Sequence, residues 1–339
     1  MTDTDIPRVM EGGASRMHTR FTVGTGLVAA TLLLAGCSST NGTDDADRGS
    51  GEIVVHNCGR DVTLPHAADA AITVNQGATE SALAIGAGGQ LIGTAYLDDE
   101  IAPQWADAYK KIPVLAPEYP DREKVIEAKP DLVAASYASA FDDKALGSRD
   151  ELAGLGIETY VSPFGCADKS DRPDPSWDAI AGETSDYGKL FGREDAADTV
   201  NDQMRATLDT VTTAKAGADK KIFWYDSATD TPFVGAGDGG PQLIIDAVGG
   251  TNVFDRLEGG WADGNWEDVV RADPDVIVLA DAGWDTAAAK RTYLESDPVL
   301  KNLRAVRDGA FVVLPFSEST PGARLIDGAK SVSDQLAKL

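Results

Sequence analysis

Short apolar runs alternate with longer stretches in which apolar residues recur at helical spacing, from residue 71 to the end of the chain. The predicted strands lie at 71–74, 91–95, 132–135, 158–161, 221–225, 276–280 and 310–314. Short strands that alternate with helical stretches are typical of βαβ units. The sequence therefore predicts an α/β fold with parallel, doubly wound sheets.

The longest helical stretch begins at Glu194 and continues to about Lys215 without a proline or an interior glycine. At 1.5 Å per residue it would be roughly 33 Å long, which is enough to cross between two lobes. We therefore predict two Rossmann-like lobes, joined by this one helix, with a ligand crevice between them. The predicted N-terminal lobe covers 52–193, the connecting helix 194–216 and the C-terminal lobe 217–339.

Each predicted lobe contains the same kind of nine-residue element. Residues 123–131 read EKVIEAKPD and residues 267–275 read EDVVRADPD. Both begin a helix and run into an apolar strand. Copies separated by far more than ~50 residues do not indicate a solenoid. They indicate two related lobes, with Glu123 and Glu267 at equivalent positions.

The N-terminus carries an export signal. Residues 21–36 form an apolar run that follows Arg16 and Arg20 and is too short to span a membrane. The run ends in Leu-Ala-Gly-Cys37, which matches the lipobox of bacterial lipoproteins and predicts lipidation of Cys37. The alternative is an ordinary cleaved signal with an incidental cysteine. We assign 1–36 to the signal peptide, with Met17 as an alternative start, and 37–51 to a flexible polar tether.

The formal net charge of the chain is −25. The signal peptide contains as many basic as acidic residues, so its removal leaves this charge unchanged. A chain this acidic repels nucleic acid. We predict no nucleic-acid partner.

Two cysteines besides Cys37 remain, Cys58 and Cys166. An even pair in an exported protein is expected to form a disulfide. The alternative is two independent buried thiols. A disulfide would tie the first strand of the mature chain to the loop after residue 161.

The residues that hydrolytic enzymes use are missing or poorly placed. The predicted mature chain has two histidines, His56 and His66, both before the first sheet strand, and no Gly-x-Ser-x-Gly motif. It also lacks a cluster of zinc ligands. A glycosidase with a carboxylate pair remains a remote alternative, as does a purely structural surface lipoprotein. We predict a protein that is not an enzyme and has no cofactor or metal site of its own.

Aromatic residues follow several predicted strands. Ligands of open α/β sheets bind beyond the carboxyl ends of the strands, where aromatic rings can stack on a flat or cationic ligand. Trp261 and Trp284 lie in glycine-containing loops, and the glycine-rich loop 235–240 can offer N–H groups to an anion. Each aromatic residue has the alternative of packing in the core. The candidate ligand contacts are Tyr96, Tyr137, Trp224, Tyr225, Trp261, Trp284, Phe316 and Arg324.

Taken with the lipobox and the two lobes, the repeated Glu-x-hydrophobic-hydrophobic-x-Ala-x-Pro-Asp element resembles the Fe/B12-type (class III) substrate-binding lipoproteins of ABC importers. This resemblance implies lipid anchoring on the extracytoplasmic face of the cell membrane and delivery of a small molecule to a permease dimer. It assigns Glu123 and Glu267 to contacts with permease arginines. The alternative is that both glutamates only cap their helices. The resemblance also places a ligand-stacking tryptophan at Trp261, whereas Pro117 occupies the corresponding place in the first lobe.

The C-terminal lobe resembles a narrower, actinobacterial branch of these lipoproteins in residues 224–242, 284–287 and 314–316 and at Arg324. Its members are described either as ferric-siderophore binders or as carriers of a deazaflavin cofactor precursor. We expect a ferric siderophore, in which iron enters only as part of the chelate, because the acidic chain favours a neutral or cationic ligand. A deazaflavin precursor, whose phosphate would bind Arg324, and cobalamin are alternatives. Haem, with an axial tyrosine, is another.

Overall fold

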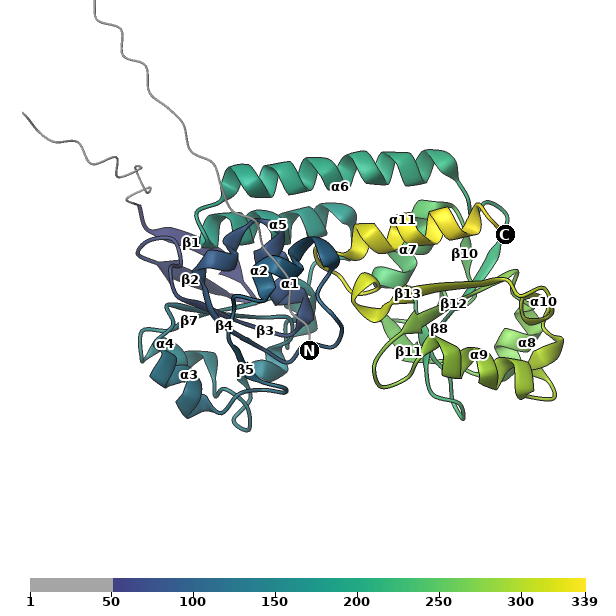
Figure 1. Ribbon diagram of the computed structural model, residues 1–339, viewed down its shortest axis with the longest axis horizontal. Helices are drawn as coiled ribbons and strands as arrows, with labels where there is room; N and C mark the ends of the chain where they lie inside the picture. Colours follow the sequence, from purple (N-terminus) through teal and green to yellow (C-terminus); the bar gives the residue numbers. More distant parts are fainter. Residues whose placement is uncertain (1–50) are drawn as a thin grey trace, which may run out of the picture. The chain divides into compact units, whose positions relative to one another are not determined.

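Two open sheets and a small hairpin form the framework of the computed structural model, which describes residues 51–339 (Figure 1). The first sheet and its helices, residues 52–193, are called the N-terminal lobe here. The second sheet and its helices, residues 217–339, are called the C-terminal lobe. The two lobes and the α/β class agree with the sequence-based prediction.

The sheet of the N-terminal lobe has five parallel strands in the order β5-β4-β3-β6-β7. Its strands are β3 Ala71–Val74, β4 Leu91–Ala95, β5 Val114–Ala116, β6 Leu132–Ala135 and β7 Glu158–Val161. The helices are α1 Gln76–Ala84, α2 Ala106–Tyr109, α3 Arg122–Ala128, α4 Arg149–Ala153 and α5 Trp177–Leu190. An antiparallel hairpin of β1 Ile53–Asn57 and β2 Arg60–Leu64 precedes them.

The sheet of the C-terminal lobe has six strands and is mixed. The path β11-β9-β8-β12-β13 describes five of them, and β10 pairs with β8. Its strands are β8 Lys221–Ser227, β9 Phe233–Gly235, β10 Thr251–Asn252, β11 Trp261–Asp263, β12 Val276–Asp281 and β13 Phe311–Pro315. The helices are α7 Gly240–Val248, α8 Trp266–Ala272, α9 Ala287–Ser296, α10 Arg304–Arg307 and α11 Leu325–Leu336.

The antiparallel part of this sheet corrects the expectation of parallel strands throughout. β9 runs antiparallel to β8, and β11 runs antiparallel to β9. The connection from β8 to β9 consists of residues 228–232. Such a short segment can close a hairpin, whereas a parallel crossover needs about a dozen residues or more.

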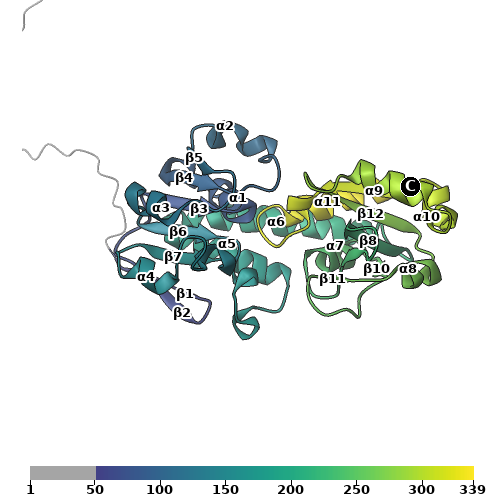
Figure 2. The same cartoon turned by 90° about the horizontal axis from the view of Figure 1, so that it is seen from below.

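Both sheets are covered on their two faces, which explains why their central strands read as unbroken apolar runs. In β12, Val276 and Val278 face one core, while Ile277 and Leu279 face the other. Helices α7 and α11 cover the first of these faces, and helices α8, α9 and α10 cover the second (Figures 1 and 2). The N-terminal lobe is built in the same way, with α1 and α5 on one face and α3 and α4 on the other.

Helix α6, Glu194–Ala214, begins at the predicted residue and packs along α5 and then along α11 and α7 (Figure 1). Near its start Ala197 belongs to a core cluster of the N-terminal lobe. Farther along, Met204 and Val211 belong to a core cluster of the C-terminal lobe. One helix therefore contributes to the cores of both lobes.

The predicted disulfide joins Cys58, in the turn between β1 and β2, to Cys166, in the loop after β7. The signal peptide, Cys37 and almost all of the predicted tether lie outside the described residues. Across residues 51–339, no helix combines the length and the apolar character needed to cross a membrane.

Candidate ligand-binding cleft

A cleft with a volume of about 910 Å³ lies between residues of the two lobes. The loops that follow β4, β6 and β7 supply its N-terminal wall through Asp98, Tyr137 and Phe164. The loop that follows β13 supplies Phe316 from the other lobe. The cleft therefore lies at the carboxyl ends of the strands, where ligands of open α/β sheets bind.

Aromatic rings line both walls. Tyr137 and Phe164 come from the N-terminal lobe, and Trp261 and Phe316 come from the C-terminal lobe. The ring centroids of Trp261 and Phe316 are 6.2 Å apart, and those of Phe316 and Trp284 are 5.0 Å apart. Trp284 does not line the cleft and is 56% exposed. Three rings thus form a row from the cleft wall to the protein surface.

Tyr137 and Asp98 both have raised pKa values in the N-terminal wall. Burial and the nearby charge of Asp98 raise the pKa of Tyr137 to about 12. The residue as a whole remains 41% exposed, because it borders the open cleft. Burial, together with the charge of Asp99, raises the pKa of Asp98 to about 6. At neutral pH the phenol is therefore protonated, while the carboxyl of Asp98 is largely ionised.

Trp224 and Tyr225 correct the sequence-based expectation, because both side chains are fully buried and neither lines the cleft. They occupy β8, which pairs with neighbouring strands on both sides and is covered on both faces. Trp224 packs in the core beneath α7 and α11, and Tyr225 packs in the opposite core. The Tyr225 hydroxyl donates a hydrogen bond to the Ala228 carbonyl at 2.8 Å. Both residues are core residues.

Tyr96 also lies off the cleft lining. Its ring packs edge-on against Tyr119, with centroids 4.8 Å apart, at the margin of the N-terminal core. The chain beyond it does reach the cleft at Asp98. The expectation that ligands bind beyond the strand ends therefore holds for the loop after β4, but Asp98 lines the cleft and Tyr96 does not.

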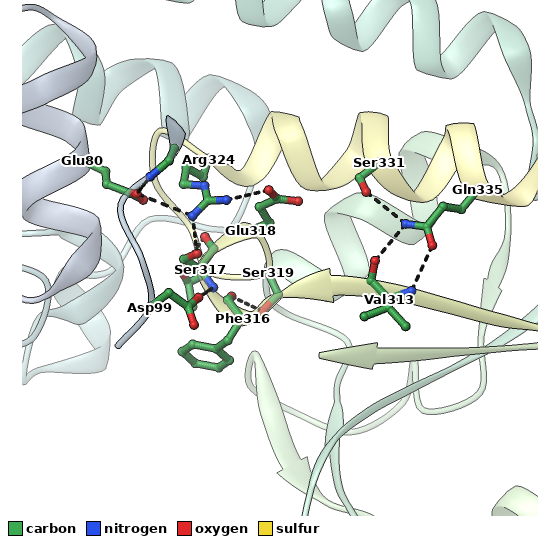
Figure 3. A network of polar contacts seen from close by, with 12 residues as sticks. Glu80, Asp99, Val313, Phe316, Ser317, Glu318, Ser319, Arg324, Ser331 and Gln335 are labelled. Carbon is green, nitrogen blue, oxygen red and sulfur yellow. Dashed lines mark hydrogen bonds and ion pairs between the residues drawn. The ribbon is translucent and has the colours of Figure 1, made fainter. Parts of the chain in front are cut away.

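Arg324 is buried behind the cleft and does not line it. Its guanidinium lies 2.6 Å from a carboxylate oxygen of Glu318 and 3.5 Å from one of Glu80, and it donates to the Ser317 hydroxyl at 2.6 Å (Figure 3). Burial nevertheless raises the pKa of Glu80 to about 7, although the charge of Arg324 opposes the shift. With two carboxylates already around it, Arg324 joins the lobes instead of offering a free cation to a ligand phosphate.

Sequence reasoning missed the loop after β7, which supplies eight lining residues between Phe164 and Pro175. Lys169 and Arg172, the two basic residues of the lining described here, both lie in it. The disulfide at Cys166 anchors this loop, and Arg172 donates to the Cys166 carbonyl at 2.7 Å. Gly165 permits the close approach, since a Cβ there would lie 2.0 Å from the Ser136 carbonyl oxygen. The position of the loop after a predicted strand was the available signal.

Acidic side chains outnumber the two basic ones in the cleft. The carboxylates of the lining are Asp98, Asp142, Asp174, Asp238 and Glu258. A cleft lined mainly by one sign of charge attracts ligands of the opposite sign. The lining therefore favours a neutral or cationic ligand.

The glycine-rich loop 235–240 has a structural role at this wall. The amides of Ala236, Gly237 and Asp238 donate to the carbonyls of Gly260, Leu257 and Gly259. A Cβ on Gly239 would lie 2.4 Å from the Cα of Gly260. These glycines let two loops pack together, and three N–H groups expected for an anion are already used.

The two repeated glutamates occupy equivalent positions. Glu123 is the second residue of α3 and Glu267 is the second residue of α8. Both are exposed, and neither has a hydrogen-bond or ion-pair partner among residues 51–339. The cap of α8 is Asn265, whose side chain accepts from the Asp268 amide. Neither glutamate therefore caps its helix through a side-chain hydrogen bond.

No group of three or more His, Cys, Asp or Glu side chains within the described part of the chain is arranged to hold a metal ion. His56 pairs with Asp61 on the β1–β2 hairpin, and the ring of His66 bonds to the Ala67 carbonyl. Neither histidine lines the cleft. The cleft offers aromatic rings, hydroxyls and carboxylates.

The family model described as periplasmic binding protein matches residues 72–318, which is most of the chain. The chain belongs to this family. Its fold and its matches are those of the class III binding proteins. The matches are periplasmic binding proteins and a vitamin B12-binding protein, so the protein is a binding protein and not an enzyme.

Three relatives illustrate the match. The vitamin B12-binding protein of Yersinia pestis is 25% identical over 222 residues, covering 65% of this chain and 72% of that protein. A periplasmic binding protein structure from Veillonella parvula is 25% identical with a TM-score of 0.75, covering 86% of this chain and 99% of that one. The structure of an ABC-type Fe3+-hydroxamate transport system from Saccharomonospora viridis is 21% identical with a TM-score of 0.70, covering 84% and 98%. The last supports the fold alone.

Proposed function

We propose that this protein is the lipid-anchored receptor of an ABC importer, and that it captures a ferric siderophore in the cleft and delivers it to a permease dimer. The observation that supports a ferric siderophore as the ligand is the composition of the cleft. Four aromatic residues line it, together with five carboxylates and two basic residues, in a volume of about 910 Å³. Such a volume lies near the upper end for small-molecule sites.

A ferric siderophore suits this lining because it brings its own iron ligands. The protein then has to supply ring faces and a few polar contacts, which Tyr137, Phe164 and Trp261 can provide. The excess of carboxylates favours a chelate with a positive charge. Ferrioxamine B, a ferric trihydroxamate with a free ammonium group, is the matching probe.

Haem fits less well. An axial tyrosine binds ferric haem as a phenolate. The raised pKa of Tyr137, about 12, disfavours that form. The described histidines lie outside the lining.

A deazaflavin precursor is the second candidate, and Lys169 and Arg172 are the observation in its favour. A phosphate would bind these two basic residues of the tethered loop and not Arg324. Cobalamin, the ligand named for the Yersinia pestis relative, is a third, large and mostly uncharged candidate. Both can use the same aromatic walls.

Delivery would depend on Glu123 and Glu267. Each is an exposed, unpartnered carboxylate at the second residue of a helix, with one on each lobe. Arginine can bind a carboxylate in bidentate fashion, and such pairs set specificity and association rate more than affinity. A permease dimer can present one arginine cluster to each lobe.

The anchor would be Cys37. Stable membrane attachment needs more than one acyl chain, which lipidation of an N-terminal cysteine supplies. Fractionation of cells that express Cys37→Ala tests this point, because the variant should leave the membrane. If it stays there as the parent does, the lipobox interpretation fails.

Native mass spectrometry of the protein purified from its own host tests the identity of the bound ligand. Titration with ferrioxamine B, an anionic ferric tris-catecholate, haemin, cyanocobalamin and a phosphorylated deazaflavin follows. We expect the cationic ferric chelate to bind most tightly. Binding of haemin, of cyanocobalamin or of the phosphorylated deazaflavin in preference to both ferric chelates would overturn the choice.

A further inference from the structure

The turn of the β1–β2 hairpin is bonded to a loop that forms part of the N-terminal wall of the cleft. This loop, residues 162–176, connects β7 to α5. The hairpin lies beside β7 (Figure 1), where the Asn57 side chain donates to the Val161 carbonyl at 2.7 Å and accepts from the Val161 amide at 2.9 Å. The next residue, Cys58, forms the disulfide with Cys166. Two successive hairpin residues thus hold the end of β7 and the loop that follows it.

Beyond Cys166 the loop has few attachments to the rest of the described chain. The hydrogen bonds of residues 167–175 all stay within 166–172, and none of these residues forms an ion pair with another part of 51–339. The hairpin turn also packs closely here, since a Cβ on Gly59 would lie 2.8 Å from a carboxylate oxygen of Asp171. Apart from the chain itself, the disulfide is therefore the one covalent or hydrogen-bonded link between residues 166–175 and the other described residues.

This part of the loop makes up a large share of the cleft wall. Six lining residues lie in it, namely Ala167, Lys169, Arg172, Pro173, Asp174 and Pro175. A loop without fixed attachments loses conformational freedom when a ligand binds against it, and this loss weakens binding. A loop that is already held in place avoids most of that loss.

We propose that Cys58 is a positioning residue of the ligand-binding cleft, which holds residues 167–175 in the cleft wall through its disulfide with Cys166. The inference deepens the proposed function and rests on it for the choice of ligand. It gives the hairpin, which lies outside the sheets of both lobes, a role in affinity. Without the disulfide, Asn57 still joins the hairpin to Val161, so the lobe should stay folded while the loop becomes mobile.

Titration with ferrioxamine B tests the proposal on the full-length protein in detergent. The oxidised parent is compared with the Cys58→Ser, Cys166→Ser double variant, whose dissociation constant should rise at least about tenfold. The control is Leu294→Ala, because Leu294 is fully buried on α9 and lies outside the cleft lining. This control should melt at a lower temperature and keep the parental dissociation constant. An unchanged constant for the double variant, or an equal rise for Leu294→Ala, overturns the proposal.

Trypsin measures the mobility of the loop without any ligand. Its cleavage site there is the bond after Lys169, because Pro173 protects the bond after Arg172. Cleavage after Lys169 should be at least about tenfold faster in the double variant than in the parent, while cleavage after the exposed Lys215 stays unchanged. No acceleration at Lys169, or the same acceleration at both lysines, overturns the proposal. If the oxidised parent does not bind ferrioxamine B, the proposed ligand is wrong, and the trypsin rates alone decide the role of Cys58.

Discussion

The Asp99 carboxylate, in the loop after β4, accepts a hydrogen bond from the backbone amide of Ser317 at 2.7 Å, across 218 positions of sequence (Figure 3). Asp98 and Ser317 both line the cleft. The contact therefore joins the lobes directly beside the ligand site. Together with the Glu80–Arg324 pair, it fixes the lobes through side chains as well as through α6.

Trp261→Ala should weaken ligand binding without unfolding the C-terminal lobe. Stacking on a ring contributes about 1 kcal/mol beyond burial, so the dissociation constant should rise roughly fivefold or more. Isothermal calorimetry with the ligand identified in host-purified protein measures this. The control is Trp105→Phe, since Trp105 packs at the N-terminal core and does not line the cleft. An unchanged constant for Trp261→Ala would remove Trp261 from the ligand contacts.

Reduction of the Cys58–Cys166 disulfide should lower the melting temperature of the soluble protein. The two cysteines are 108 positions apart, and loop-closure models give a stabilisation of at most about 4–5 kcal/mol for such a loop. Calorimetry with and without reductant tests this. A Cys58→Ser, Cys166→Ser double variant should melt lower and show no response to reductant. Two alkylatable thiols in the unreduced, denatured parent would contradict the pairing.

Buried Glu183 of α5 should make the protein less stable as pH rises. Burial raises the pKa of Glu183 from 4.5 to about 7, and the nearby Ser162 hydroxyl opposes the shift. The folded state therefore binds the proton more tightly than the unfolded state. Stability is fully present below about pH 4.5 and is lost as pH rises toward and through about 7.

The expected loss is at most about 3 kcal/mol, and Glu183→Gln should remove it. Urea denaturation at several pH values measures the slope. The exposed Glu127→Gln variant serves as the control and should follow the parent. A parent whose free energy of unfolding rises between pH 5 and 7 in a Glu183-dependent way would contradict the assignment.

Replacing Glu123 and Glu267 together by glutamine should separate binding from delivery. Glutamine keeps the size of each side chain and removes the charge that arginine would pair with. The double variant should bind its ligand with parental affinity and show little uptake in host cells that lack the native gene. Glu127→Gln combined with Glu295→Gln is the matched control, on α3 and α9. If the double variant of Glu123 and Glu267 takes up the ligand as the parent does, the repeated element reflects only the shared architecture of the lobes.

The pattern of apolar residues was sufficient to predict the strands that are buried on both faces. β3, β4, β6 and β7 have the predicted bounds, and β3 and β6, which are buried at every position, lie in the middle of their sheet. The β1–β2 hairpin, β5 and the antiparallel β9 and β11 were missed. These strands are short or lie at sheet edges, where one side is polar and the apolar signal is weak.

The candidate site was less predictable than the fold, because the position and direction of each side chain decide whether it lines the cleft. Trp224 lies in a central strand, whereas Trp261, which the sequence places in a glycine-containing loop, lies in an edge strand at the cleft. Arg324 pairs with Glu80 of the other lobe, a contact that the sequence around Arg324 does not predict. Lys169 and Arg172 line the cleft in a loop that a disulfide joins to Cys58, more than 100 positions away in sequence. Such long-range placements leave no local pattern.

The disulfide has a practical consequence for labelling. Both cysteines within residues 51–339 are used in it, so a soluble protein that begins at residue 51 has no free thiol. A single cysteine in place of Trp284, which is exposed and adjoins Phe316 of the cleft, would be the sole attachment point for an environment-sensitive dye. The chain is thereby suited to a reagentless optical sensor for whichever small molecule enters between its lobes.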